Sequence, residues 1–336
     1  MPSAGINTFI IHDLTGPCAH RASARGTHMM KMKLPRRTLL HLAASAAALQ
    51  SMARIARAQN LPTTQTPFMD RYAMVDGLRL HYLDWGTPTK PAMILVHGIA
   101  RHAHTFDHIV PEFTRDYRVI ALDMRGHGDS AWSSEGAYLV EDHVKDLEAI
   151  IHELGLARVT LWGNSTGGRV VQVYAGLHPE IVERLIVEDV GPERPQSIAE
   201  GFANRVRREA VGWASEDDLV TQLKTQNPRT PEPILRTYAR FGTTRRSDGR
   251  LIWKFDPNLV KGFVETELWQ YVSKITSPTI FVIGGASPIV PAEIQKRLSN
   301  TLPNCEVVVM PGLGHYPNEE DTTGFLTLVN RFLKRG

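Results

Sequence analysis

A single stretch, LWGNSTGG at residues 161–168, constrains the fold of this chain most strongly. An apolar run of strand length precedes it at residues 159–162, and an amphipathic run of helical type follows it. The pattern G-x-S-x-G between a strand and a helix predicts a sharp turn with an exposed serine hydroxyl. Gly163 and Gly167 flank Ser165 because a Cβ at either position would collide with the neighbouring turn. We therefore predict that Ser165 projects from the end of the strand, beside the first amides of the new helix.

Short apolar segments alternate with helical patterns along most of the chain after residue 58. The predicted strands are residues 72–75, 78–83, 92–96, 117–122, 159–162, 185–189, 278–283 and 306–310. Apolar residues recur at helical spacing at 140–154 and 325–333. This alternation predicts an α/β fold with a largely parallel sheet that helices cover on both faces.

Residues 192–275 interrupt this alternation with a mostly helical pattern that prolines and glycines break up. We interpret the segment as a helical cap, or lid, inserted between the strands at 185–189 and 278–283. Residues 59–191 and 276–336 are then the two parts of the core.

Residues 1–58 are predicted to lie outside the fold. Arg36 and Arg37 precede an alanine-rich, mildly apolar run, and residues 56–58 supply a small-x-small pattern for cleavage. This resembles a twin-arginine signal peptide behind an upstream extension, so we expect export to the periplasm. The alternatives are a cytoplasmic chain or one tethered to a membrane by an uncleaved leader. The apolar run is shorter than the ~20 residues of a membrane span, so we expect no stable insertion after cleavage.

The leader also explains the basic character of the whole chain. It carries eight Lys or Arg and one acid, so the net charge of +3 becomes −4 without it. No basic patch for a nucleic acid remains, and a small-molecule substrate is the expected partner. Cys305 is the one cysteine after the leader, which excludes an internal disulfide there. No Cys/His cluster has the spacing of zinc ligands, and we expect neither a metal nor another cofactor.

A serine hydroxyl needs a base to take its proton, and histidine is the usual base. His315 follows the last predicted strand, in a glycine-containing loop at residues 311–317. In an open α/β sheet, ligands bind at the carboxyl edge of the strands, so His315 and Ser165 should face one crevice. Of the other histidines, His97 and His127 are expected to shape their loops, and His102, His104 and His108 to be solvated.

Acyl transfer to a serine also needs donors for the oxyanion of the intermediate, and backbone amides commonly supply them. One should be the amide of Thr166, which follows the nucleophile. The other should come from the loop after the strand at 92–96, where we select Ile99.

Taken together, these motifs resemble the α/β-hydrolase superfamily. They are His97-Gly98, Asp123-x-Arg-Gly-His-Gly-x-Ser130, Gly163-Asn-Ser-Thr-Gly167 and Gly314-His315, in the order found there. The resemblance runs from about residue 68 to the C-terminus apart from the cap. It implies an eight-stranded, mostly parallel sheet with a helical cap inserted after the sixth strand. It is specific for the fold and weakly specific for the substrate.

One departure from the superfamily concerns the acid that orients the histidine. That acid usually follows the strand at 278–283 in a Gly-x-x-Asp pattern, but here the turn has Ser287 and no carboxylate before Glu293. Some branches take the acid from the end of the preceding strand, among them certain haloalkane dehalogenases and the hydrolase of 2-(acetamidomethylene)succinate. Glu188 and Asp189 stand there, on opposite sides of the strand. The motif match favours Asp189; without it His315 would rely on water.

The resulting hypothesis is a serine hydrolase that cleaves an ester, thioester or amide through an acyl-enzyme on Ser165. One alternative is hydrolysis of a C–C bond, as in meta-cleavage-product hydrolases, whose nucleophile turn also has Gly-Asn-Ser. Another is a protein of this fold that binds a small ligand without turnover. A substrate carboxylate is one feature that several such substrates share, and Arg101, after the oxyanion loop, is our candidate to bind it. The cap has 14 Lys or Arg against 11 acids, and we expect most of its arginines to be solvated.

Overall fold

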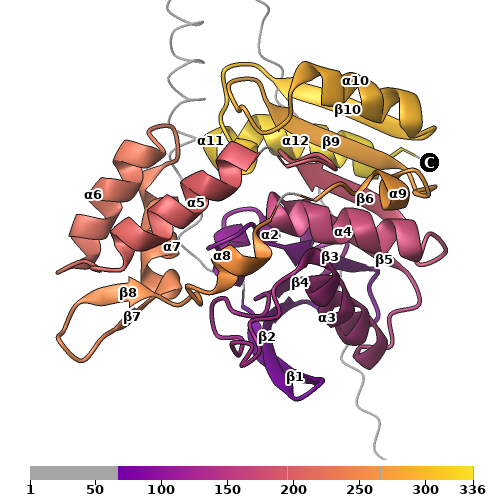
Figure 1. The fold of residues 1–336 in the computed structure, drawn as a ribbon. Coiled ribbons are helices and arrows are strands. Elements are labelled where there is room, and N and C mark those ends of the chain that lie inside the picture. Colours follow the sequence, from indigo (N-terminus) through magenta and orange to yellow (C-terminus); the bar gives the residue numbers. More distant parts are fainter. Residues whose placement is uncertain (1–66, 195, 265, 336) are drawn as a thin grey trace, which may run out of the picture. The chain divides into compact units, whose positions relative to one another are not determined.

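A sheet of eight strands lies at the centre of the chain's described part, shown in Figure 1. The computed structural model describes residues 67–335 apart from residues 195 and 265. In spatial order the strands are β1 (Met69–Val75), β2 (Leu78–Trp85), β4 (Arg118–Leu122), β3 (Ala92–Val96), β5 (Val159–Asn164), β6 (Val182–Glu188), β9 (Thr279–Gly284) and β10 (Cys305–Met310). The β1–β2 and β2–β4 pairs are antiparallel and the other pairs are parallel. The predicted eight-stranded, mostly parallel sheet is therefore confirmed.

The strands follow from burial and turn chemistry. Every residue of β3, β4, β5 and β9 is buried, which explains their continuous apolar sequences, because helices cover both faces of the sheet. The edge strand β1 is mostly exposed. It joins β2 through Asp76 and Gly77, whose φ angles of 46° and 80° suit a tight hairpin turn.

Helices pack on both faces of the sheet. The helices that contribute to one apolar cluster are α3 (Val140–Glu153), α4 (Thr166–Leu177), α9 (Trp269–Val272) and α10 (Ala292–Thr301). The opposite cluster includes residues of the short 3-10 helix Ala103–Phe106, α2 (Val110–Phe113) and α12 (Thr322–Leu333). In that second cluster Trp162 stacks on Phe325 with ring centres 5.1 Å apart, and Phe113 meets the same indole edge-on. These layers fix β5, and hence the turn that follows it.

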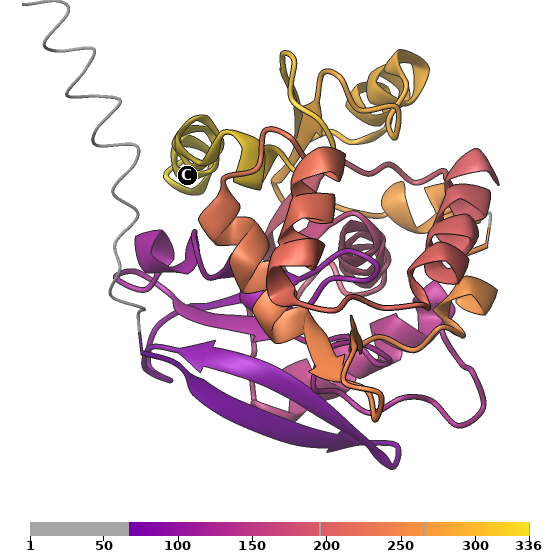
Figure 2. The same cartoon turned by 90° about the vertical axis from the view of Figure 1, so that its left-hand side faces the viewer.

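The segment between β6 and β9 is not part of the sheet. It contains α5 (Gln196–Glu209), α6 (Glu216–Gln226), α7 (Glu232–Gly242), β7 (Thr243–Arg245), β8 (Leu251–Trp253), α8 (Leu259–Gly262) and α9. Figure 1 shows α5, α6 and α7 on one side of the sheet, and in Figure 2 α6 and α7 lie side by side while α5 stands apart from them. A third apolar cluster contains residues of all three helices together with Trp253. Trp269 and Val272 of α9 instead belong to the cluster on the sheet. The cap boundaries at 192 and 275 stay a prediction.

The predicted leader, with its cleavage pattern at 56–58, lies outside the described residues and stays a prediction. Within residues 67–335, leaving out the two undescribed positions, no helix is both long and apolar enough to cross a membrane.

The tight contact at Gly167 generates a prediction about stability. A Cβ on Gly167 would collide with the backbone carbonyl of Val96, whereas one on Gly201 in α5 would meet nothing within 4 Å. Gly167→Ala should therefore lower the free energy of unfolding by at least ~2 kcal/mol. Gly201→Ala should raise it by about 0.5–1 kcal/mol, because alanine is the better helix former. Urea unfolding curves of the two variants check this, and equal midpoints would contradict it.

Candidate active site

The turn between β5 and α4 holds Ser165 in a strained conformation. Its φ and ψ angles of 51° and −119° lie outside the regions that residues with a side chain normally occupy. A Cβ on Gly163 would collide with Gly167, and one on Gly98 would lie 2.8 Å from the side chain of Asn164. The Ser165 amide donates to the Glu188 carbonyl on β6 at 3.0 Å. The packing around the turn therefore imposes the strain and projects the hydroxyl from the sheet, as the glycine pattern predicts.

Ser165, His315 and Asp189 form a hydrogen-bonded series. His315 Nε2 lies 3.0 Å from Ser165 Oγ, and His315 Nδ1 lies 2.6 Å from Asp189 Oδ2. The three residues follow β5, β10 and β6, so the carboxyl ends of three parallel strands bring them together. With Nδ1–H donated to the carboxylate, Nε2 is left as the acceptor for the serine proton.

The Asp189 carboxylate is fully buried and accepts three hydrogen bonds. Besides His315, its donors are the Gly284 amide at 2.9 Å and the Ser287 hydroxyl at 2.5 Å. Ser287 belongs to the turn where the superfamily usually has its acid. That turn therefore contributes a hydroxyl that fixes the carboxylate supplied by β6.

Glu188, the neighbouring carboxylate, points to the other side of β6, as the alternation of a strand requires. It accepts from the Asn318 amide at 3.0 Å and from the Trp162 indole at 3.3 Å. Neither partner lines the cavity, and the structure brings Asp189, and not Glu188, to His315.

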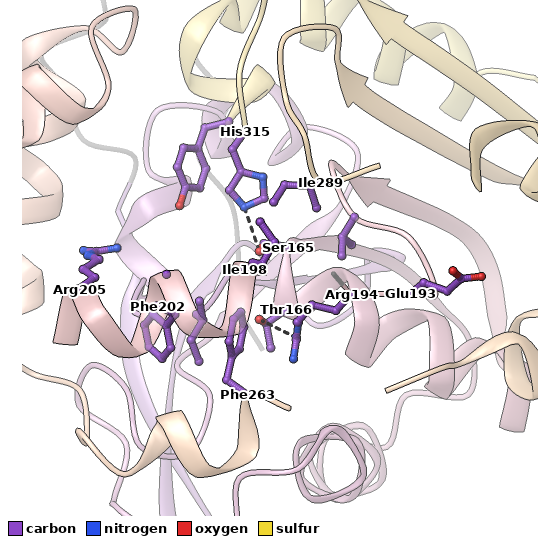
Figure 3. A pocket seen from close by; sticks show the side chains of 14 residues that line it. Ser165, Thr166, Glu193, Arg194, Ile198, Phe202, Arg205, Phe263, Ile289 and His315 are labelled. Carbon is purple, nitrogen blue, oxygen red and sulfur yellow. Dashed lines mark hydrogen bonds between the residues drawn. The ribbon is translucent and has the colours of Figure 1, made fainter. Parts of the chain in front are cut away.

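A cavity of about 200 Å³ opens on Ser165 and is shown in Figure 3. Ile99 and Thr166, the predicted oxyanion donors, both line it together with His315. Its other lining residues come mostly from the segment between β6 and β9 and include Arg194, Ile198, Phe202, Arg205 and Phe263. The cavity is thus largely apolar, with the reactive groups at one end and two arginines at its wall.

Arg101 does not lie where we predicted a substrate contact. Its side chain is 4% exposed and pairs with the Glu319 carboxylate at 2.9 Å. The guanidinium also lies over the rings of Tyr238 and Tyr316, 4.4 and 3.8 Å from their centres. Because Glu319 already satisfies its charge, Arg101 has a structural role in this arrangement. Sequence reasoning overlooked Arg194, which lines the cavity five residues after Asp189.

The prediction of solvated histidines after the oxyanion loop was wrong for His102 and His104, which are buried. The segment between β6 and β9 covers them: His102 Nε2 donates to the Tyr238 carbonyl at 3.1 Å, and His104 stacks on Phe241 with ring centres 3.7 Å apart. His97 has the loop role predicted for it. Its ring nitrogens lie 2.7 Å from the Gly98 carbonyl and 3.1 Å from the Met124 amide.

One group of described residues has metal-ligand geometry. Ligand atoms of His81, Asp123 and Asp129 lie within 4.8 Å of one another. Asp123, however, already accepts from the amides of Ala103 and Asp129 at 2.7 and 2.9 Å, and it pairs with His81 at 2.7 Å. These bonds account for the cluster as a support of the loop after β4, and none of its three residues lines the cavity.

A serine, a histidine and a carboxylate in series at the carboxyl edge of a mostly parallel sheet are the arrangement of α/β-fold hydrolases. Comparison with known proteins agrees. The sequence profile of the α/β-hydrolase fold matches residues 91–322. The chain therefore belongs to this family. Since its relatives include hydrolases and esterases, we assign it to the hydrolases.

Two relatives and one solved structure illustrate the similarity. The chain is 28% identical to the 3-hydroxybutyrate-oligomer hydrolase of Cupriavidus necator, over 72% of this chain and 89% of the relative. It is also 28% identical to an esterase of Mycobacterium tuberculosis, over 65% of this chain and 75% of that protein. The crystal structure of E-2-(acetamidomethylene)succinate hydrolase superposes with a TM-score of 0.73 at 25% identity, over 80% of this chain and all of that one.

The burial of Glu188 generates a prediction about pH. Burial raises the pKa of Glu188 to about 8, and the hydrogen bond from the Asn318 amide offsets this only in part. An unfolded glutamate ionises near 4.5, so between about pH 4.5 and 8 the folded chain holds a proton that the unfolded chain has lost. This contribution to stability is complete below pH 4.5 and is lost as the pH rises through about 8.

Glu188→Gln keeps the shape of the neutral acid and cannot ionise. As the pH rises from 5 to 9, the free energy of unfolding of the wild type should therefore fall relative to that of this variant. The fall should be about 1.4 kcal/mol per pH unit over the range in which Glu188 is protonated in the folded chain and ionised in the unfolded one. Denaturant unfolding of both proteins across that range checks it. A stability difference that does not change with pH would show that Glu188 is ionised throughout.

Proposed function

We propose that this protein is a serine hydrolase that cleaves a carboxylic ester, or a related thioester or amide, of a small substrate through an acyl-enzyme on Ser165. The observation that carries the proposal is the hydrogen-bonded series Ser165–His315–Asp189 at the wall of a cavity. Membership of the hydrolase family and the esterase among its relatives support the same reaction class.

Each group has a defined role in the proposed reaction. Ser165 Oγ attacks the substrate carbonyl carbon while His315 Nε2 takes the hydroxyl proton. The carbonyl oxygen becomes an oxyanion, which the backbone amides of Ile99 and Thr166 stabilise. When the intermediate collapses, His315 gives the proton to the leaving alcohol, thiol or amine. A water molecule then attacks the acyl-enzyme with His315 again as base, which releases the acid and restores Ser165.

Asp189 acts through His315 and does not touch the substrate. Its carboxylate holds Nδ1–H, so that Nε2 faces Ser165, and it stabilises the imidazolium formed during each proton transfer. The donors from Gly284 and Ser287 hold the carboxylate in place for this task. The volume of about 200 Å³ favours substrates with a short acyl group.

The nucleophile is tested by labelling. A fluorophosphonate should modify the wild-type protein at one residue, Ser165, and the protein should hydrolyse short p-nitrophenyl esters. Ser165→Ala should lose both reactions and keep its melting temperature within a few degrees, since the change removes one small hydroxyl. Peptide mass spectrometry locates the label. Labelling of the alanine variant, or of another residue in the wild type, would contradict the assignment.

The acid is tested by kinetics. Asp189→Asn should lower kcat by up to ~10⁴-fold, because the imidazole loses the acceptor that sets its tautomer. KM should change little, since the residue acts only through His315. Glu188→Gln on the same strand is the matched control and should retain kcat within about tenfold. A near-normal kcat in Asp189→Asn would remove Asp189 from the mechanism.

A further inference from the structure

Arg194 is a buried cation at the wall of the Ser165 cavity. The residue is 7% exposed, and it lines the cavity together with Ser165 and Thr166. Nη2 donates to Thr166 Oγ1 at 3.5 Å, and Nη1 donates to the Val264 carbonyl at 3.1 Å. The guanidinium also lies 3.8 Å from the centre of the Phe263 ring. Figure 3 shows this side chain beside Thr166, a short way from the serine.

The charge of Arg194 has no acidic partner among the described residues. This distinguishes it from Arg205, the other arginine of the cavity, which pairs with Glu209 at 3.0 Å. It also differs from Arg101, which pairs with Glu319. Burying a cation without a counter-ion is costly, so a site of this kind is expected to have an anionic ligand.

A second buried cation lies close to the first. Arg169, in the first turn of α4, is fully buried, and its charge disfavours protonation of Arg194. Among the described residues its guanidinium donates to neutral oxygens only, on Gly191, Pro192 and Thr266. Burial, and then the charge of Arg169, lower the pKa of Arg194 to about 9, which leaves it charged at neutral pH. The amino end of α4 adds its partial positive charge.

The one acidic side chain among the described residues that line this cavity is already engaged. Glu193 lines the cavity, but its carboxylate accepts from the Trp269 indole at 2.5 Å and from Arg297 at 3.1 Å. Figure 3 shows it directed away from Ser165. A guanidinium has five N–H donors, and the two bonds given above use two of them. Donors therefore remain for a carboxylate, which arginine binds in a fork geometry.

From this arrangement we propose that Arg194 binds a free carboxylate on the substrate of the proposed hydrolase. The inference rests on the proposed function and names its substrate class: half-esters of short dicarboxylic acids, or the corresponding thioesters and amides. Thr166 sets the length of the substrate. Its hydroxyl contacts Arg194, and its amide is the proposed oxyanion donor. The bound carboxylate and the reacting carbonyl would therefore lie on either side of Thr166, separated by about the size of this one residue. This spacing suits succinate and glutarate derivatives.

The test compares an anionic substrate with a neutral one of the same shape. Monoethyl glutarate carries the carboxylate, and its monoamide, ethyl 4-carbamoylbutanoate, replaces it with an uncharged amide; monoethyl succinate and its monoamide form a second pair. Ethanol release gives kcat/KM for each. The wild type should prefer the acid at least tenfold. Arg194→Met should lower kcat/KM for the acid by about 10- to 100-fold, the value of a charge-assisted hydrogen bond, and change that for the amide less than threefold.

Two further variants separate binding from folding and from long-range charge. Arg194→Lys retains the cation and should keep part of the preference. Arg207→Met makes the same chemical change at an exposed position of α5 and should keep all of it. Equal losses on acid and amide in Arg194→Met would overturn the proposal, because Arg194 would then act on the oxyanion or on the fold.

Binding without turnover keeps this inference separable from the proposed function. In Ser165→Ala, calorimetry should show monoethyl glutarate binding at least tenfold more tightly than its monoamide, and Arg194→Met in the same background should abolish the difference. Equal affinities would overturn the carboxylate site. Selective binding of the acid, in a wild-type protein that hydrolyses none of the esters, would retain the site and reject the hydrolase.

Discussion

The buried carboxylate of Asp189 is the interaction on which the site depends. It lies just beyond β6 with a φ of 45°, and it accepts hydrogen bonds from β9, from the following turn and from His315 after β10. Three segments far apart in the sequence thus meet at one anion. Because a buried carboxylate without donors would be strongly disfavoured, each of these bonds also helps to fix the segment that carries its donor.

The second constraint is the turn at Ser165, whose strain the neighbouring strands support. Gly167 packs directly on the backbone after β3, so the turn cannot relax without separating β3 from α4. The amides of Ile99 and Thr166 come from the two sides of this contact. The packing that strains the nucleophile is therefore the same packing that places the proposed oxyanion donors, which is how a rigid sheet can prepare a site for acyl transfer.

The sequence predicts the core and the reactive pair because these depend on local patterns. Strand and helix periodicity predicts the sheet, and the glycines around Ser165 predict the turn. The position of His315 directly after a strand predicts that it lies at the carboxyl edge of the sheet. The prediction of Asp189 as the acid needs two further observations. These are the resemblance to a superfamily and the absence of an acid from the turn that holds Ser287. Its assignment rests on what a segment lacks as well as on what it contains.

The ion pair of Arg101 and the burial of His104 could not be predicted in this way. Arg101 is paired because Glu319, more than 200 residues later, folds against it, and His104 is buried because Phe241 covers it. No pattern around either residue reports such a partner. Arg194 shows the converse: its guanidinium pairs with no acid among the described residues, and only the folded chain reveals this. Charge and spacing select candidates, and packing decides which of them remain available to a substrate.

The most direct test of the proposed mechanism is a crystal structure of the protein after reaction with a fluorophosphonate. We expect phosphorus bonded to Ser165 Oγ, with the phosphoryl oxygen about 3 Å from the amides of Ile99 and Thr166. His315 should still be hydrogen-bonded to Asp189. Phosphorus on another residue, or a phosphoryl oxygen directed away from both amides, would contradict it.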